Sequence, residues 1–399
     1  MSSYACTVVS NEPTFELRGF LALFEDMAPH LTEPCSICID LSYPSMFGPS
    51  GMVPFVALVN KIVQEGWEID YVPPEPGSPL SAYWDSAGWR HALQEEPLPN
   101  PRSRRTYIPI IHFADHPTLN SSITAAMDVL STTTEYLPGV LNAIEWSLNE
   151  VTDNVLVHSG ATGWLQVIAR PNQNRLDFVV VDCGEGIPST LRQRYPQVVE
   201  DGELLQIAME RGTTRDASIG QGNGLAGCLR ITEALSGWMN VASRNAVLRL
   251  GDDQVVRLSP LSDFPGSIVS MTLKTTESIN LTDALWGYTP TSAFEISNVS
   301  QAGILFVLAN EQTIYGNRPT GAELALKLKN IMNENPEEKV IIDFSGIDIT
   351  SASFLDEFLA KMAARVGIAT FFAKVAIINA NSFVETTLNE VLAQRVRIE

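Results

Sequence analysis

The alternation of apolar and polar positions predicts a small α/β unit near the start of the chain. The apolar run Cys35–Leu41 is typical of a buried strand. Val53–Val63 repeats apolar residues at helical spacing, and Trp67–Val72 has the composition of a second strand. A strand, a helix and a strand in this order indicate an α/β arrangement.

The middle of the chain combines helices with strands that form hairpins. Leu119–Ser159 is mostly helical in its pattern, and Leu225–Leu235 is helical again. Gly163–Arg170 and Leu176–Asp182 alternate like strands, and Pro171–Asn174 between them predicts a hairpin turn. Further strands are predicted at Met239–Asp252, Gln254–Leu258 and Ser267–Lys274.

The C-terminal part of the chain alternates strands with helices, which again predicts an α/β layer structure. The predicted strands are Gly303–Ala309, Val340–Phe344 and Thr370–Ile378. The predicted helices are Thr320–Asn333, Phe354–Val366 and Ser382–Gln394. Residues 94–108 are rich in proline and charge, so we expect a linker or boundary loop there.

The composition narrows the class of protein. Apolar residues make up 45% of the 399 residues, which excludes disorder along the whole chain. Lysine and arginine number 26 against 46 acidic residues, and a net charge of −20 argues against general nucleic-acid binding. No apolar run approaches about 18 residues, and the N-terminus lacks the pattern of a signal peptide. We therefore expect no membrane span and a cytoplasmic location.

A first candidate site lies in the segment 148–159, with the sequence LNEVTDNVLVHS. Glu150, Asn154 and His158 are four residues apart, so at about 100° per residue they share one face of a helix. They flank an apolar stripe formed by Leu141, Ile144, Leu148, Val151 and Val155. Polar side chains at the rim of a packed face suit the floor of a pocket, although an ordinary amphipathic helix would show the same pattern.

A second candidate site follows the apolar strand that ends at Asp182. A carboxylate there could accept a hydrogen bond from the exocyclic amine of adenine, whereas guanine presents a carbonyl at that position. Gly184 and Gly186 would let the backbone approach a flat base closely. A strand followed by a plain turn is the alternative interpretation.

A third candidate site is the glycine-rich segment at residues 220–225, GQGNGL, directly before a predicted helix. Free amides and the positive end of a helix dipole suit phosphate groups. The segment before it is polar rather than a strand, which excludes a dinucleotide fingerprint, and Leu225-Ala226 replaces the residues that a P-loop requires.

In this order, the three segments resemble the GHKL nucleotide-binding superfamily of gyrase-type ATPases, histidine kinases and anti-sigma-factor serine kinases. The resemblance covers about residues 120–275 and implies an α/β sandwich over a mixed sheet, with ATP and Mg²⁺ under a mobile lid at about residues 188–219. It implies that Asn154 ligates Mg²⁺ and that Glu150 is the catalytic residue, polarising a water or an acceptor hydroxyl. The implied ATP-binding residues are Asn154, His158, Asp182, Gly184, Gly186, Ile187, Thr214, Gly220, Gly222, Asn223, Gly224, Leu225 and Ser267.

The C-terminal unit resembles STAS-like domains, the fold of anti-sigma-factor antagonists. The stretch from Val340 to Glu357 has a buried strand, a turn crowded with hydroxyls and a helix start. In antagonists of this kind a serine at that turn is phosphorylated, and the equivalent residue here is Ser351. Ser353, three residues before Asp356, forms a capping-box pattern instead. The N-terminal unit resembles a second STAS-like domain more distantly.

We therefore expect an α/β protein with a central GHKL domain at 119–280, a STAS-like domain at 300–399 and an N-terminal α/β domain at 1–110. The favoured function is a regulatory protein in which binding and slow hydrolysis of Mg-ATP switch its conformation or its partner binding. The alternatives are a serine/threonine kinase acting on a STAS-like domain and a non-catalytic interaction module. ATP and a protein partner are expected as ligands, and a homodimer is compatible with the resemblance.

Overall fold

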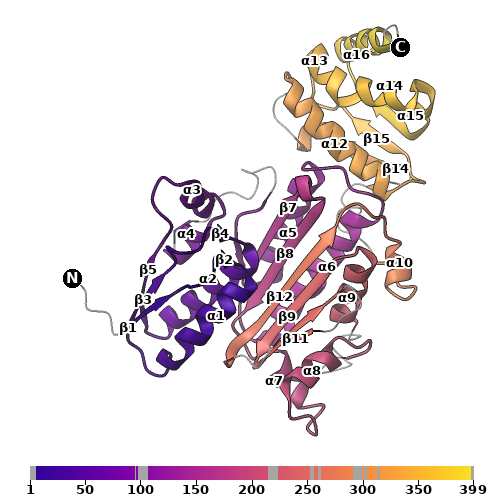
Figure 1. Ribbon diagram of the computed structural model, residues 1–399. Coiled ribbons are helices and arrows are strands. Elements are labelled where there is room, and N and C mark those ends of the chain that lie inside the picture. The colour runs from indigo at the N-terminus through magenta and orange to yellow at the C-terminus, as the bar shows by residue number, and fades with distance from the viewer. Residues whose placement is uncertain are drawn as a thin grey trace. The chain divides into compact units, whose positions relative to one another are not determined.

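The computed structural model describes residues 6–94, 96–97, 107–213, 223–251, 256–258, 262–290, 299–300, 303–311 and 315–396 (Figure 1). The chain divides into two compact units. Unit 1 consists of Met1–Val129, Trp146–Thr275 and Ala284–Gly287, and unit 2 of Leu130–Glu145, Thr276–Asp283 and Tyr288–Glu399.

Unit 1 is built on a seven-stranded sheet with the strand order β11-β10-β9-β12-β8-β7-β6. Each pairing in this sheet is antiparallel. The strands are β6 (Ile111–Phe113), β7 (Gly163–Arg170), β8 (Arg175–Asp182), β9 (Trp238–Arg244), β10 (Ala246–Leu250), β11 (Val256–Leu258) and β12 (Phe264–Lys274). The predicted hairpin of β7 and β8 is confirmed, with Asn174 closing the turn at a positive φ of 48°.

The prediction of a single strand at 239–252 is wrong, because residues 239–250 fold as a hairpin. Ser243 pairs with Ala246, so Arg244 and Asn245 form a two-residue turn between β9 and β10. Arg244 has a positive φ of 53°. Such turns usually carry glycine, and this one has only Asn245 as a turn signal, which explains why the pattern conceals it.

Two long helices follow β6 along the chain. The predicted helical stretch 119–159 is broken at residues 132–139 into α5 (His116–Ser131) and α6 (Val140–Asn154), and α6 ends in a π-helical turn at Val155–Ser159. The other helices of this region are α7 (Ile187–Arg192), α8 (Asp201–Ala208), α9 (Gly224–Ala234) and α10 (Leu281–Ala284).

The N-terminal part of unit 1 is an α/β layer with a parallel sheet in the order β1-β3-β5. A second, two-stranded sheet pairs β2 with β4 in parallel. The strands are β1 (Cys6–Val9), β2 (Thr14–Phe15), β3 (Ser36–Asp40), β4 (Met46–Phe47) and β5 (Glu68–Val72). The helices are α1 (Leu17–Met27), α2 (Pro49–Gln64), α3 (Pro79–Ser86) and α4 (Trp89–Leu93), which bears out the strand, helix and strand predicted here.

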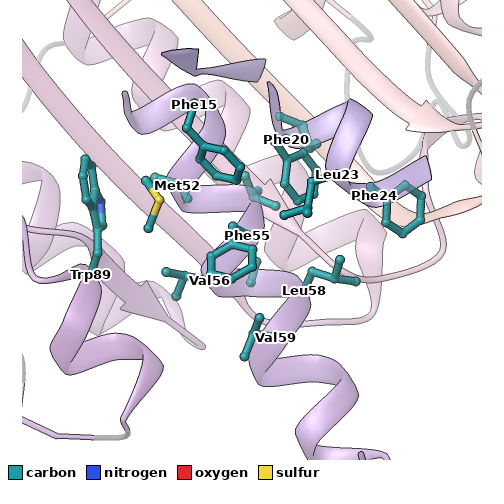
Figure 2. Close-up of a cluster of buried hydrophobic side chains, with 14 of the residues drawn as sticks. Phe15, Phe20, Leu23, Phe24, Met52, Phe55, Val56, Leu58, Val59 and Trp89 are labelled. Carbon is teal, nitrogen blue, oxygen red and sulfur yellow. The ribbon is translucent and has the colours of Figure 1, made fainter. Parts of the chain in front are cut away.

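Helices α1 and α2 cover one face of the seven-stranded sheet (Figure 1). Phe20 and Phe24 of α1 meet Phe264 of β12 edge to face, with ring centroids 5.9 and 5.4 Å apart. Val181 of β8 and Ile268 of β12 belong to the same buried cluster, whose N-terminal part is drawn in Figure 2. The N-terminal layer and the large sheet therefore share one hydrophobic core.

The opposite face of the sheet carries α9, which contacts β9 and β12. Because side chains alternate along a strand, Val180 and Asp182 of β8 point away from the face that Val181 contributes to the core with α1 and α2. Helix α6 packs on α9, since a Cβ atom at Gly227 would lie 2.2 Å from the ring of Trp146. The glycine allows the two helices to approach closely.

Unit 2 contains a four-stranded sheet with the order β13-β14-β15-β16. The strands are β13 (Val299–Ser300), β14 (Gly303–Val307), β15 (Val340–Asp343) and β16 (Val375–Ile378). The helices are α12 (Arg318–Glu334), α13 (Ala352–Leu355), α14 (Lys361–Val366), α15 (Ile368–Lys374) and α16 (Ser382–Val396), with a π-helical segment at Asp356–Ala360. The strand predicted at 370–378 is wrong in its first half, which forms α15 and buries Phe371 in the core. The overall prediction of an α/β protein is confirmed.

Candidate nucleotide site

Helix α6 presents its apolar stripe to the interior and its polar residues at the rim. Leu148, Val151 and Val155 are buried, whereas Glu150 and Asn154 are half-buried. This is the arrangement that the 3,4 spacing of apolar residues predicts. The two polar side chains are therefore held on a rigid helix and remain accessible from one side.

Glu150 lies against the start of α9. A Cβ atom at Gly224 would lie 2.5 Å from Oε2 of Glu150, so only a glycine fits there without displacing the carboxylate. A negative charge is favoured at a helix N-terminus. Burial, together with the neighbouring charge of Asp153, raises the pKa of the Glu150 carboxyl. A carboxyl with a raised pKa can accept a proton closer to neutral pH than an exposed one.

The π-helical turn at the C-terminal end of α6 lies against the loop that follows β8. The backbone N–H of Glu185 donates to the carbonyl oxygen of Ser159 at 2.9 Å. A Cβ atom at Gly184 would lie only 2.1 Å from the same oxygen. Glu150 and Asn154 are thus on a helix whose end contacts the loop after Asp182 and whose side contacts the start of α9.

His158 lies in the π-helical turn that follows α6, where hydrogen bonds span five residues instead of four. Its side chain is half-buried there.

Asp182 is a buried carboxylate, 4% exposed, at the end of β8. Its Oδ1 accepts the backbone N–H of Gly184 at 2.8 Å, and the backbone of Ser267 donates to the same carboxyl. Burial raises the pKa of Asp182 to about 7, although both backbone donors lower it. A carboxylate has lone pairs for about four donors, so capacity remains for another donor.

A serine that the sequence analysis did not single out connects three parts of this site. Ser243 of β9 is fully buried, and its Oγ accepts the backbone N–H of Ile187 at 3.0 Å. The same hydroxyl donates to the carbonyl of Gly266 at 2.6 Å and lies 3.0 Å from Oγ of Ser267. Ser243 pairs with Ser267 across β9 and β12, a register that the sequence alone does not reveal.

Two glycines of this site are held in conformations that side chains rarely adopt. Gly186 has a φ of +80° and directly precedes α7, and a Cβ atom there would lie 2.7 Å from the side chain of Arg244. Gly266 has a φ of +100°, and a Cβ atom there would lie 2.1 Å from the carbonyl oxygen of Asp182. Glycine is therefore needed at both positions, for its backbone conformation and for lack of space.

The rest of the predicted set is distributed as follows. Asn223 and Leu225 are half-buried at the start of α9, and Oδ1 of Asn223 accepts the backbone N–H of Gly212 at 3.2 Å. Thr214, Gly220 and Gly222 lie outside the described residues. The described part of the predicted lid contains α7 and α8.

Ser351 in unit 2 caps the start of α13. Its Oγ accepts the backbone N–H of Phe354 at 3.0 Å and lies 2.9 Å from Oγ of Ser353. The capping-box prediction for Ser353 is wrong, because the helix begins two residues earlier than its pattern predicts. Ser351 is the residue at the positive end of this helix.

Comparison with protein-family models identifies two regions of the chain. Residues 140–276 match the model of the histidine kinase-, DNA gyrase B- and HSP90-like ATPases. Residues 320–385 match a STAS-like domain of unknown function. The chain therefore joins a GHKL-type ATPase region to a STAS-like region, as the resemblance implied. No curated protein and no solved structure matches the chain.

The match to the ATPase model supports ATP binding and, in general terms, an ATPase or kinase activity. Across the residues that the structure describes, we find no helix with both the length and the apolar character needed to cross a bilayer.

Proposed function

We propose that the chain binds Mg-ATP where α6, the loop after β8 and the start of α9 meet, and that slow hydrolysis switches its conformation or partner binding. The observation that carries the proposal is the double contact of α6, with Glu150 against Gly224 and Ser159 against Gly184. This contact brings motifs that are far apart in sequence to one helix. The match to the ATPase family model supports the same assignment.

Each polar residue has a role that its surroundings support. Asp182 accepts the exocyclic amine of adenine, since its two backbone donors leave lone pairs available. Glu150 acts as the general base for the attacking water, for which its raised pKa is suited. On the basis of the family resemblance, we assign His158 and the backbone amides around Gly224 to the phosphate groups.

Asn154 fits a magnesium ion that is bound mainly by the nucleotide. Mg²⁺ prefers oxygen ligands and usually keeps several waters, with few ligands from the protein and the rest from phosphates. Among the described residues, no group of three histidine, cysteine or acidic side chains could hold a metal ion by itself. One amide oxygen from Asn154 is compatible with that mode of binding.

The proposal is tested by calorimetric titration of the full chain with ATP, in the presence and in the absence of Mg²⁺. We expect Asn154→Ala to abolish the Mg²⁺-dependent part of the affinity, because it removes the protein's oxygen ligand. Asn172→Ala is the matched control, since Asn172 is exposed in the β7–β8 turn. An affinity of Asn154→Ala equal to that of the control would contradict the assignment.

A protein serine kinase is the second candidate function. The STAS-like match supplies a substrate class, and the Ser351 hydroxyl lies at a helix start where a phosphate would meet the helix dipole. Phosphoryl transfer depends mainly on positioning and charge neutralisation, so the residues proposed for hydrolysis also serve transfer.

Incubation of the full chain with γ-labelled ATP separates the candidates. Free labelled phosphate without labelled protein is the expected result for the switch. Label on the protein that disappears in Ser351→Ala favours the kinase, with Ser345→Ala as a control at an exposed serine. No nucleotide affinity at all favours the non-catalytic module.

The proposed organisation is an N-terminal α/β domain at 1–110, possessing a distant STAS-like outline, an ATP-binding domain at 119–280 and a STAS-like domain at 300–399. We propose a cytoplasmic regulatory protein that binds a protein partner. A STAS-like domain is one class of partner that fits this proposal. Measurement of the molecular mass in solution, with and without Mg-ATP, tests whether a homodimer forms.

A further inference from the structure

Helix α12 of the STAS-like region binds the segment that leads into α6. Asn330 is fully buried, and its Nδ2 donates to the carbonyl oxygens of Ser131 at 2.7 Å and Thr134 at 2.9 Å. Its Oδ1 accepts the backbone N–H of Tyr136 at 2.9 Å. One buried amide therefore fixes three backbone groups of the turn between α5 and α6, and all of these residues belong to unit 2.

The last turn of α12 continues this contact to the first turn of α6. Asn333 donates from Nδ2 to the carbonyl oxygen of Tyr136 at 2.9 Å. The Glu334 carboxylate accepts the backbone N–H of Gly139 at 3.1 Å and that of Leu141 at 3.0 Å. Glu334 therefore satisfies amides at the N-terminus of α6 that have no partner inside the helix.

The turn that Glu334 contacts has little freedom to adopt another shape. Gly139 has a φ of +83°, and a Cβ atom there would lie 1.9 Å from the carbonyl oxygen of Ile279. The N–H of Ile279 in turn donates to the carbonyl oxygen of Pro138 at 3.0 Å. The start of α6 is thus defined by backbone contacts, and the side chains of α12 complete them.

From these contacts we infer that Asn330 and Glu334 are positioning residues for the nucleotide site, through which the STAS-like region and ATP binding influence each other. This inference rests on the proposed function. Glu150 lies on the same continuous α-helix as Leu141, about 14 Å further along its axis. A change of α12 that releases Gly139 and Leu141 alters where α6 begins, and Glu150 and Asn154 follow.

Such a link is reciprocal, because coupling between two binding events is a property of both. If the state of α12 changes ATP affinity, ATP must change the stability of the α12 contacts by the same factor. Coupling of this kind typically corresponds to about 5- to 150-fold in affinity. A residue that serves only local stability would show no nucleotide-dependent effect at α12.

The test uses the full chain and three variants. Glu334→Gln removes the charge and keeps the size of the side chain. Asn330→Ser removes the buried amide but, unlike alanine, keeps one polar group in its place. Glu337→Gln removes an exposed charge just beyond α12 and is the matched control. ATP affinity is measured by calorimetry, and amide hydrogen exchange is followed over 131–141 and 329–334 with and without Mg-ATP.

In the wild type and in Glu337→Gln we expect Mg-ATP to slow exchange in both segments. In Glu334→Gln and Asn330→Ser we expect ATP affinity to fall about fivefold or more, and the nucleotide-dependent protection of 329–334 to disappear. Unchanged affinity and protection in both variants, with the wild type binding ATP, would overturn the inference and leave the proposed function intact. A wild type that does not bind ATP would overturn both.

Discussion

The two faces of the seven-stranded sheet are both covered, yet they differ in chemistry. Toward α1 and α2, Val181 and Ile268 join an apolar core that includes Phe20. On the other face, Asp182, Ser243 and Ser267 form a buried polar group at neighbouring register positions. Both sets come from the same strands, because alternate residues point to opposite faces.

One strand register therefore specifies the core and the candidate site together. A shift of one residue along β8 would place Asp182 in the apolar layer and Val181 at the site. The apolar face therefore fixes the strand register that positions the polar residues, although its own side chains take no part in binding or catalysis. Substitutions on the apolar face should lower stability, whereas substitutions on the polar face should change nucleotide binding.

The largest effect is expected for Phe20→Ala on the apolar face. Phe20 is fully buried between Phe24 and Phe264, so the substitution should lower the free energy of unfolding by about 3–5 kcal/mol. Denaturant unfolding measures this loss. Tyr43→Ala, at a side chain that is 60% exposed, serves as the control.

In the fraction of Phe20→Ala that remains folded, ATP affinity should equal that of the wild type. A folded Phe20→Ala protein that no longer binds ATP would break the proposed separation of the two faces.

A smaller and opposite effect on stability is expected for Asp182→Asn. The pKa of Asp182 is raised in the folded protein to about 7, so the folded state holds a proton that the unfolded state has already lost. This group therefore favours folding at acidic pH, and that contribution is lost as the pH rises from about 4 to 7. Asn cannot ionise, so the variant should be more stable than the wild type at pH 8, by on the order of 1–3 kcal/mol.

Thermal unfolding at pH 5 and pH 8 measures this difference, which should shrink at the lower pH. The same variant should lose its preference for ATP over GTP, because an amide can present a donor as well as an acceptor. An unchanged nucleotide preference would remove Asp182 from the base-reading role, whatever the effect on stability.

The smallest change in free energy is expected for Gly224→Ala. The added methyl group would displace the Glu150 carboxylate, so we expect turnover of ATP to fall about tenfold, which equals about 1.4 kcal/mol in the barrier. The free energy of unfolding should change little, because alanine is favoured over glycine in a helix. Gly316→Ala is the control, since a Cβ atom there meets nothing within 4 Å.

Equal turnover in Gly224→Ala and Gly316→Ala would show that the Glu150 carboxylate can move without consequence, and Glu150 would then not be the base.

Local patterns predicted those elements that carry clear start and stop signals. The β7–β8 hairpin has alternating strands around a proline and asparagine turn, and its strands lie where the pattern places them. The segment 368–374 has the aromatic composition of a strand but forms α15, whose Phe371 is buried in the core of unit 2. Tertiary packing overrides such a local preference.

The candidate site was predictable in part, for a related physical reason. Glu150 and Asn154 stand out because they flank the apolar stripe of a helix, and Asp182 stands out because it ends an apolar strand. Ser243 does not, since its importance depends on its pairing with Ser267, which no local pattern reveals. The contacts of Asn330 are equally hidden, because they join segments almost 200 residues apart in the chain.

The buried Asp182 also has a consequence for the heat of ligand binding. In the free protein at neutral pH a large share of this carboxyl is protonated, since its pKa is about 7. An adenine amine donates a stronger hydrogen bond to the ionised carboxylate than to the protonated carboxyl, so binding at or below pH 7 should favour ionisation and release protons to the buffer. The apparent binding enthalpy should therefore differ between phosphate and Tris, in proportion to the ionisation heat of each buffer.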